Sequence, residues 1–200
     1  MGRSPYLLRR ASAPNLDVIL ELLEEAVKWL RGKNTDQWAQ PWPDAGKRDD
    51  RILQDLTAGK TWIVWDGDIP AGTVTIDTDD PVDLTGNYIW PTFRRPEKAL
   101  YVRRVITRRS HAGLGLGAGL LDWASAVAQR KIGTPLIRID VWTDNWKLHA
   151  YYRRQGFTLC EFRDQKDLPD YPSRALFERR TSPNGNHGGS ALVIEHESAW

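Results

Sequence analysis

The sequence has almost no sulfur, with a single cysteine, Cys160, and a single methionine among 200 residues. One cysteine excludes an internal disulfide and a cysteine-rich metal site, and it is typical of a reducing compartment. Long hydrophobic runs are also missing, and none approaches the roughly 18 residues that a membrane span needs. The basic N-terminal stretch lacks the apolar segment of a secretory signal. These absences predict a cytoplasmic protein that does not associate with membranes.

The sequence also has no large excess of one charge, because it contains 28 basic and 26 acidic residues and its net charge is +2. That balance gives no support to nucleic-acid binding. Tryptophan, in contrast, is abundant, with ten residues. Trp29, Trp62 and Trp123 fall within periodic segments and are expected in the core. Five others lie near expected loops or element ends and could line a pocket for an apolar or cationic ligand: Trp38, Trp42, Trp90, Trp142 and Trp146.

The first half of the chain predicts helices followed by a hairpin. A short strand at 7–9 precedes a helix that starts at Ser12 and Pro14 and stops at Gly32. A loop rich in Pro, Gly and Trp follows, and then a second helix over 50–58. Two strands joined by the Asp-Gly turn at 66–67 come next, and the alternating stretch 73–77 belongs to the second of them.

The second half predicts alternating strands and helices. A strand over 100–107 leads through a glycine loop into a helix over about 115–131, followed by a short strand, a helix over 145–155 and two closing strands. This order predicts a single α/β (α+β) domain with a largely antiparallel first half. We expect that domain to span residues 1–181. The Gly/Asn-rich tail over 182–200 is expected to be mobile or to pair with a partner.

The stretch S-H-A-G-L-G-L-G-A at 110–118 is the strongest local signal. Glycine is costly in regular structure, so a cluster at a helix entrance predicts close approach of a ligand, and a phosphate suits a helix N-terminus. Gly113, Gly115 and Ala118 fit a loose dinucleotide-binding pattern, with Asp140 as its ribose-binding acid. The charged spacer 108–111 between strand and glycines argues against that interpretation, and no Walker lysine follows.

A second interpretation fits better. The segment V-I-T-R-R-S-H-A-G-L-G-L-G-A resembles the acyl-CoA pyrophosphate loop of the GCN5-related N-acetyltransferase (GNAT) superfamily. Gly115 and Gly117 match its glycines, whereas Ala112 stands where the family has Arg or Gln. The segment D-N-W-K-L-H-A-Y-Y-R-R-Q-G-F resembles a second family motif through Asn145, Tyr152 and Gly156-Phe157.

The resemblance implies a mixed, mostly antiparallel sheet, splayed at the cofactor strand, and acetyl-CoA as cosubstrate. A backbone N–H near Val105 or Ile106 would then face the thioester carbonyl, and Arg108 or Arg109 could replace the charge missing at Ala112. The cofactor-binding residues so implied are Val105, Ile106, Thr107, Arg108, Ala112, Gly113, Leu114, Gly115, Leu116, Gly117, Ala118 and Asn145.

The same resemblance implies a general acid and leaves the general base open. Tyr152 would protonate the leaving thiolate, and Tyr151 points elsewhere on the helix. Asp140 is one candidate base, although a salt bridge with Arg138 is the interpretation we favour from the sequence. The acidic residues that end the central hairpin, Asp77, Asp79 and Asp80, could attract a cationic amine or form a solvated loop. His149 lies one turn before Tyr152 on the same helix and is expected to be a packed or surface histidine. His111 lies in the phosphate loop and is not expected to reach the acceptor. No metal cluster or Ser–His–Asp order stands out.

The sequence therefore predicts an acyltransferase that acetylates the primary amine of a small molecule. Acetylation of a protein or peptide amine is an alternative, and so is an acyl-CoA-binding sensor without turnover. The expected partners are a small-molecule amine, with no nucleic acid and no membrane, and the C-terminal tail could pair across a homodimer.

Overall fold

The computed structural model describes residues 5–180 and 192–194. These residues fall into two compact units. The first unit takes in the chain up to Thr75, the segment Arg104–Trp123 and the described part of the tail. The second takes in Ile76–Arg103 and the described residues from Ala124 to Arg180. Two strands, Ile69–Asp77 and Leu100–Thr107, and one helix, Leu116–Val127, therefore contribute residues to both units.

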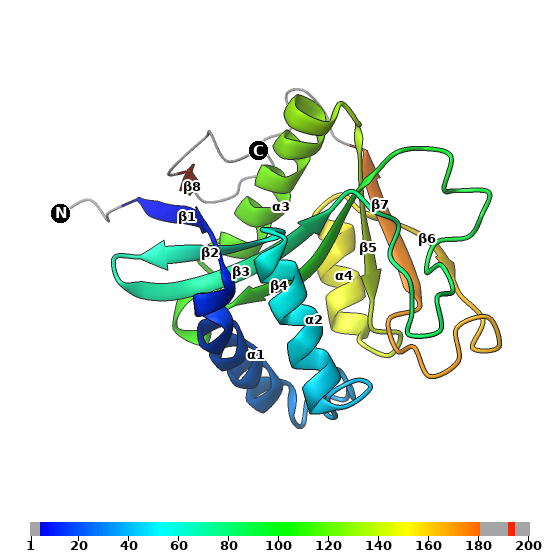
Figure 1. The fold of residues 1–200 in the computed structure, drawn as a ribbon, viewed down its shortest axis with the longest axis horizontal. Coiled ribbons are helices and arrows are strands. Elements are labelled where there is room, and N and C mark those ends of the chain that lie inside the picture. Colours follow the sequence, from blue (N-terminus) through cyan, green and yellow to red (C-terminus); the bar gives the residue numbers. More distant parts are fainter. Residues whose placement is uncertain (1–4, 181–191, 195–200) are drawn as a thin grey trace. The chain divides into compact units, whose positions relative to one another are not determined.

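The first unit combines mostly antiparallel strands with helices (Figure 1). Its elements are β1 (Tyr6–Arg10), α1 (Leu16–Leu30), α2 (Ala45–Thr57), β2 (Thr61–Asp66), most of β3 (Ile69–Asp77), the end of β4 (Leu100–Thr107), most of α3 (Leu116–Val127) and β8 (Leu192–Ile194). Strand β2 pairs antiparallel with both β1 and β3, and β8 pairs in parallel with β1. Apolar side chains of α1 and α2, including Leu22 and Ile52, form one core cluster with Ile63 and Ile106.

The second unit holds the other strands and α4 (Figure 1). Its elements are the end of β3, the start of β4, the end of α3 (Leu116–Val127), β5 (Leu136–Val141), α4 (Trp146–Arg154), β6 (Thr158–Phe162) and β7 (Ala175–Arg180). Strand β7 pairs antiparallel with β5 and β6, and β4 starts parallel to β5. Its core includes Trp90, Tyr101 and Leu176.

Several element ends differ from the sequence prediction for identifiable reasons. Helix α2 begins five residues earlier than expected, because the Asp44 carboxylate accepts the Lys47 N–H at 2.8 Å and caps it. Helix α3 gives way at Ala128–Ile132 to a π-helical turn, which Gly133 ends at φ +74°. Trp62 and Trp123 are buried as expected, but the prediction for Trp29 is wrong: it is 43% exposed.

The α/β class is confirmed, with a mixed sheet that is antiparallel through its first strands. The predicted splay is visible within the second unit, where the pairing of β4 with β5 covers only Leu100 and Tyr101. None of the described helices is long and apolar enough to cross a bilayer. In the predicted tail, Leu192–Ile194 add a strand, and its other positions lie outside the described residues.

Candidate active site

The glycine loop lies in the first unit and connects β4 to α3. Strand β4 ends at Thr107, a 3-10 turn spans Arg109–His111, and α3 begins at Leu116. Gly113 and Gly115 have φ angles of +79° and +80°, in the left-handed region that side chains disfavour. Gly117 is helical and has no such backbone requirement. The turn itself thus explains Gly113 and Gly115, whereas the backbone conformation of Gly117 does not require glycine.

The start of α3 presents backbone donors. The first helical hydrogen bond runs from the Gly119 N–H to the Gly115 carbonyl at 2.9 Å. The N–H groups of Leu116, Gly117 and Ala118 therefore precede the helical ladder. Ala112, Gly113 and Leu114 are exposed, and a Cβ placed on Gly113 would meet nothing within 4 Å. The loop thus offers an accessible helix N-terminus, which favours a negatively charged guest.

Helix α1 braces the first turn of this loop. The Arg108 guanidinium donates to the Pro70 carbonyl at 2.7 Å and to Glu21 at 2.8 Å, and lies 3.5 Å from Glu25. Glu25 also accepts the Arg109 N–H, and the Arg109 guanidinium lies 4.1 Å from the centre of the Trp29 ring. Both arginines expected to supply charge at Ala112 are therefore engaged with α1.

A histidine holds the same turn to the end of β2. The His111 ring is buried, and its Nε2 lies 3.0 Å from the Asp66 carboxylate. Its Nδ1 lies 2.9 Å from the Ser110 hydroxyl. The contact with Asp66 joins residues 45 positions apart in the sequence, and no local sequence pattern predicts it. His111 is thus placed as a structural residue of the loop, away from the role of a general base.

Strand β4 carries an irregular residue just before the predicted cofactor-pairing positions Val105, Ile106 and Thr107. Arg104 has a φ of +49°, which is uncommon for a residue with a side chain. Its guanidinium pairs with the buried carboxylate of Asp55 on α2. Because this φ departs from regular strand geometry, the strand after Arg104 is suited to present backbone groups to a ligand.

In the second unit, Asn145 caps the start of α4 and Tyr152 lies within that helix. The Asn145 side-chain oxygen accepts the Leu148 N–H at 3.0 Å and caps the helix. The Tyr152 ring is 7% exposed and packs edge-on against Phe157 at 5.5 Å. Burial raises the pKa of Tyr152, and the neighbouring Tyr151 and Asp140 raise it further. Tyr152 is therefore protonated at neutral pH, the state that a proton donor needs.

The candidate bases have distinct surroundings. The Arg138 guanidinium lies 3.5 Å from Glu178, and the Asp140 carboxylate accepts the Tyr171 hydroxyl at 2.5 Å, so the salt bridge that the sequence favoured for Asp140 is replaced by a tyrosine contact. His149 is fully buried and bonds the Trp142 carbonyl at 2.9 Å. In the described part of the chain, no group of three or more potential metal ligands is found.

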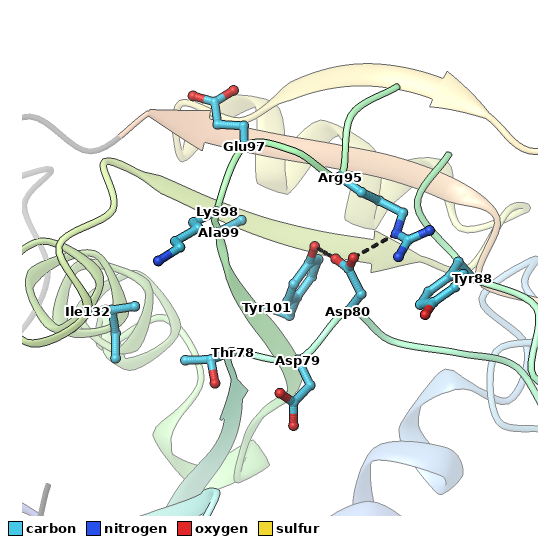
Figure 2. Close-up of a pocket in the computed structure, with 10 residues that line it drawn as sticks. All are labelled: Thr78, Asp79, Asp80, Tyr88, Arg95, Glu97, Lys98, Ala99, Tyr101 and Ile132. Carbon is cyan, nitrogen blue, oxygen red and sulfur yellow. Dashed lines mark hydrogen bonds and ion pairs between the residues drawn. The ribbon is translucent and has the colours of Figure 1, made fainter. Parts of the chain in front are cut away.

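A cavity of about 550 Å³ opens beside the hairpin end, within the second unit (Figure 2). At its centre, Asp80 accepts from the Tyr101 hydroxyl and from the Arg95 Nε, the latter at 2.7 Å. Asp77, just before it in sequence, pairs with Arg103 at 3.0 Å. The acidic residues expected to attract an amine are thus largely neutralised by their own neighbours, which weakens that role.

Comparison with known proteins identifies relatives of this architecture. The model of the acetyltransferase (GNAT) family matches residues 23–157. An uncharacterised N-acetyltransferase of Bacillus subtilis (strain 168), YesJ, is 28% identical over 144 residues, which are 70% of this chain and 74% of that protein.

Solved structures agree at the level of the fold. A GNAT-family acetyltransferase from Listeria monocytogenes superposes with a TM-score of 0.64 at 21% identity, covering 88% of this chain and 94% of that one. The PaiA N-acetyltransferase of Thermoplasma acidophilum, solved in complex with coenzyme A, has a TM-score of 0.63 at 16% identity and coverages of 88% and 99%.

Proposed function

Because the chain belongs to the acetyltransferase (GNAT) family and is thus an acyltransferase, we propose that it transfers the acetyl group of acetyl-CoA to the primary amine of a small molecule. The observation that carries the proposal is the glycine loop. There, two left-handed glycines and an accessible helix N-terminus follow directly on the irregular strand β4. A cosubstrate with a diphosphate and an extended amide-bearing arm suits that combination.

The loop residues fit the diphosphate through their backbone. The N–H groups of Leu116, Gly117 and Ala118, together with the helix dipole, are suited to bind two phosphates, each charge stabilised by on the order of 1 kcal/mol. The Arg108 side chain already binds the Pro70 carbonyl and Glu21, so it stabilises the loop. In the proposal, only the backbone of Arg108 contacts the cofactor. The missing Arg or Gln at Ala112 is tolerable for the same reason: the donors are main-chain groups.

Two further elements complete the proposed cofactor contacts. Strand β4 after Arg104 offers Val105, Ile106 and Thr107 to the amides of the extended arm, in the manner of an added strand. A backbone N–H at Val105 or Ile106 would stabilise the developing negative charge on the thioester oxygen. Asn145 keeps its structural role as a helix cap, and a contact with the cofactor remains part of the proposal.

Tyr152 is the proposed general acid. Acetyl-CoA supplies an activated acyl group whose leaving thiolate needs a proton, and a positioned donor is typically worth 10²–10⁴-fold in rate. The Tyr152 hydroxyl has its proton at neutral pH because burial raises its pKa. The flanking Phe157 and Phe177 rings hold the side chain in place, at 5.5 and 6.3 Å between ring centres.

The first experiment is thermal denaturation with and without acetyl-CoA, CoA and NAD at millimolar concentration. A ligand at 100 times its Kd stabilises the folded state by about 2.7 kcal/mol. We expect both CoA compounds, and not NAD, to raise the melting temperature. Absence of any shift with either CoA compound would contradict the proposal, and a shift with NAD alone would support the dinucleotide interpretation of Gly113 and Gly115.

A panel of primary amines, followed by lysine-containing peptides, then identifies the acceptor by release of the CoA thiol. Turnover with small amines supports the proposal. Turnover only with peptides would assign the protein-acetylating alternative, and binding of acetyl-CoA without turnover on any amine would assign the sensor. The cytoplasmic location and a homodimer stay predictions of the sequence.

A further inference from the structure

Three side chains of α1 face the start of the glycine loop within the first unit. Glu21, Glu25 and Trp29 are spaced four residues apart and therefore lie on one side of the helix. Glu21 accepts from the Arg108 guanidinium at 2.8 Å. The Trp29 ring centre lies 4.1 Å from the Arg109 guanidinium. Glu25, between them, accepts the Arg109 N–H and lies 3.5 Å from the Arg108 guanidinium, so it alone in this row bonds the backbone of the loop.

The Arg109 N–H lies where the chain leaves the sheet. One residue earlier, the Arg108 N–H still donates to the Ala71 carbonyl of β3 at 2.9 Å. After it, the 3-10 turn closes on itself, with the His111 N–H bonded to the Arg108 carbonyl at 2.9 Å. The Glu25 carboxylate therefore takes the first backbone donor beyond the strand, and it fixes the direction in which the loop departs.

Glu25 places a carboxylate beside a loop that is proposed to bind a diphosphate. Like charges repel, so on charge alone Glu25 opposes the binding of this guest. What the carboxylate supplies is a strong acceptor for a main-chain N–H, from a half-buried side chain that is 29% exposed. The effect of Glu25 on binding therefore depends on the balance between repulsion and the order that it gives to the loop.

Order in the backbone matters in this loop because Ala112 supplies no charge to the phosphates. The proposed donors are main-chain N–H groups at the start of α3, from Leu116 to Ala118, and they bind a diphosphate only in the correct arrangement. Residues 112–114, which lead to these donors, are exposed. An exposed segment loses conformational freedom when a ligand binds, and an anchor at its start reduces that loss.

We propose that Glu25 is a positioning residue for the cofactor loop. It acts through the Arg109 N–H, without touching acetyl-CoA, and holds the main-chain donors before α3 in the arrangement that binds the diphosphate. The inference rests on the proposed function. It adds a residue of α1, 84 positions before Arg109 in the sequence, to those that determine the affinity for acetyl-CoA.

The test compares Glu25→Ala with Glu25→Gln and with Glu24→Ala, a matched change at the exposed glutamate that precedes it on α1. Alanine removes the acceptor for the Arg109 N–H, whereas glutamine keeps a side-chain oxygen that can accept it. We expect the Kd of acetyl-CoA, measured by calorimetry on the full chain, to rise about tenfold in Glu25→Ala, the effect of losing one charge-assisted hydrogen bond. Glu25→Gln and Glu24→Ala should stay within about threefold of wild type.

The sign of the change separates positioning from charge. If Glu25 acted only through its charge, both substitutions at this position would remove a repulsion and lower the Kd of acetyl-CoA. Positioning predicts the opposite sign for Glu25→Ala, and recovery of the affinity in Glu25→Gln, although both variants lose the same charge.

An acyl donor without the diphosphate separates positioning from general damage to the fold. S-acetylpantetheine keeps the thioester and the amide-bearing arm of acetyl-CoA but lacks its diphosphate. With a primary amine as acceptor, Glu25→Ala should raise the KM of acetyl-CoA about tenfold and leave kcat within about twofold. Its kcat/KM with S-acetylpantetheine should equal that of wild type, because this donor does not use the loop.

The positioning role and the proposed function fail in different ways. A Kd of acetyl-CoA within about threefold of wild type in Glu25→Ala would remove the positioning role and leave the acetyltransferase proposal standing. An equal rise of the Kd in Glu25→Gln, or an equal loss of activity with S-acetylpantetheine, would also overturn the role. A wild-type protein that neither binds acetyl-CoA nor acetylates any amine would contradict the proposed function and the role of Glu25 together.

Discussion

The Tyr152 hydroxyl is the group on α4 that the proposed acetyl transfer requires as a proton donor. Tyr152→Phe keeps the buried ring and its packing on Phe157 and Phe177. We expect kcat to fall by about 100-fold or more, with acetyl-CoA affinity and melting temperature close to wild type. Tyr151→Phe, next to it on the same helix, should leave kcat within about twofold. Thiol release in the presence of the acceptor measures both.

The direction of the Tyr152 pKa adds a second expectation to the same variant pair. The pKa is raised from an ordinary 10.0, so the acid form persists through neutral and mildly alkaline pH. Deprotonation of Tyr152 should therefore cause no fall in the wild-type kcat below pH 10. Any fall in that range should persist in Tyr152→Phe, because it belongs to another group. A loss near pH 8 that Tyr152→Phe abolishes would contradict the raised pKa of Tyr152.

Arg104 tests whether the unusual backbone of β4 or its ion pair matters more to stability. Arg104→Val and Arg104→Asn both remove the guanidinium that pairs with Asp55. Only valine is strongly disfavoured at φ +49°, because asparagine tolerates the left-handed region. We expect the valine variant to be less stable than the asparagine variant by about 1 kcal/mol or more, as measured by urea denaturation.

The neighbouring Arg103 supplies the control for that comparison. It is not among the residues with positive φ, and it also pairs with a carboxylate, Asp77 at 3.0 Å. A regular strand position favours valine over asparagine. We therefore expect Arg103→Val to be more stable than Arg103→Asn, the reverse of the order at Arg104. The same order at both positions would show that the irregular backbone at Arg104 has no energetic consequence.

At the scale of the element, a comparison of two glycines separates a role of the loop in cofactor binding from the general cost of replacing a glycine that has a positive φ. Gly113 and Gly86 have φ angles of +79° and +84°, and a Cβ on either would meet nothing within 4 Å. Alanine at either position should therefore cost a similar amount of stability, about 1–2 kcal/mol. Only Gly113→Ala should weaken acetyl-CoA binding, because only that residue belongs to the loop before α3. Equal affinities in the two variants, measured by calorimetry, would remove Gly113 from the proposed cofactor site.

Local signals explain why most elements could be predicted from the sequence. Strand β4 was predicted over the residues that it occupies, since Thr107 is followed by a charged turn and glycines. The start of α2 was missed because Asp44 lies in a stretch whose Trp and Pro content indicates loop, although its carboxylate caps the helix. The π-helical turn at 128–132 was also missed, because its residues continue the helical pattern of α3.

The contacts within the candidate site were harder to predict than its elements. Asp140 meets Tyr171, and Asp66 meets His111, across 31 and 45 residues of sequence. Such pairs depend on which strands become neighbours, and neither has a spacing motif. The glycine loop and the Tyr152 helix are different, because each concentrates its chemistry within a few consecutive residues.

At the scale of the whole molecule, His149 links stability to pH. The ring is fully buried on α4; its Nε2 bonds the Trp142 carbonyl, and its Nδ1 has no hydrogen-bond partner among the described residues. Desolvation lowers the pKa of His149 below its ordinary 6.5, and the positive charge of Arg153 acts in the same direction. Protonation of the His149 Nδ1 in the folded protein would therefore create a buried N–H donor that has no hydrogen-bond acceptor among the described residues.

The sign of the stability change follows from that lowered pKa. Below pH 6.5 the unfolded chain is protonated at His149, whereas the folded chain stays neutral there until a lower pH. The free energy of unfolding therefore falls as the pH is lowered. One such group contributes a slope of at most about 1.4 kcal/mol per pH unit. We expect urea denaturation between pH 7.5 and 5 to show this loss in the wild type and less of it in His149→Gln, whose amide can still donate to Trp142. His111→Gln, which alters a histidine paired with Asp66, should retain the His149 contribution. An undiminished slope in His149→Gln would mean that another group controls the acid sensitivity of the fold.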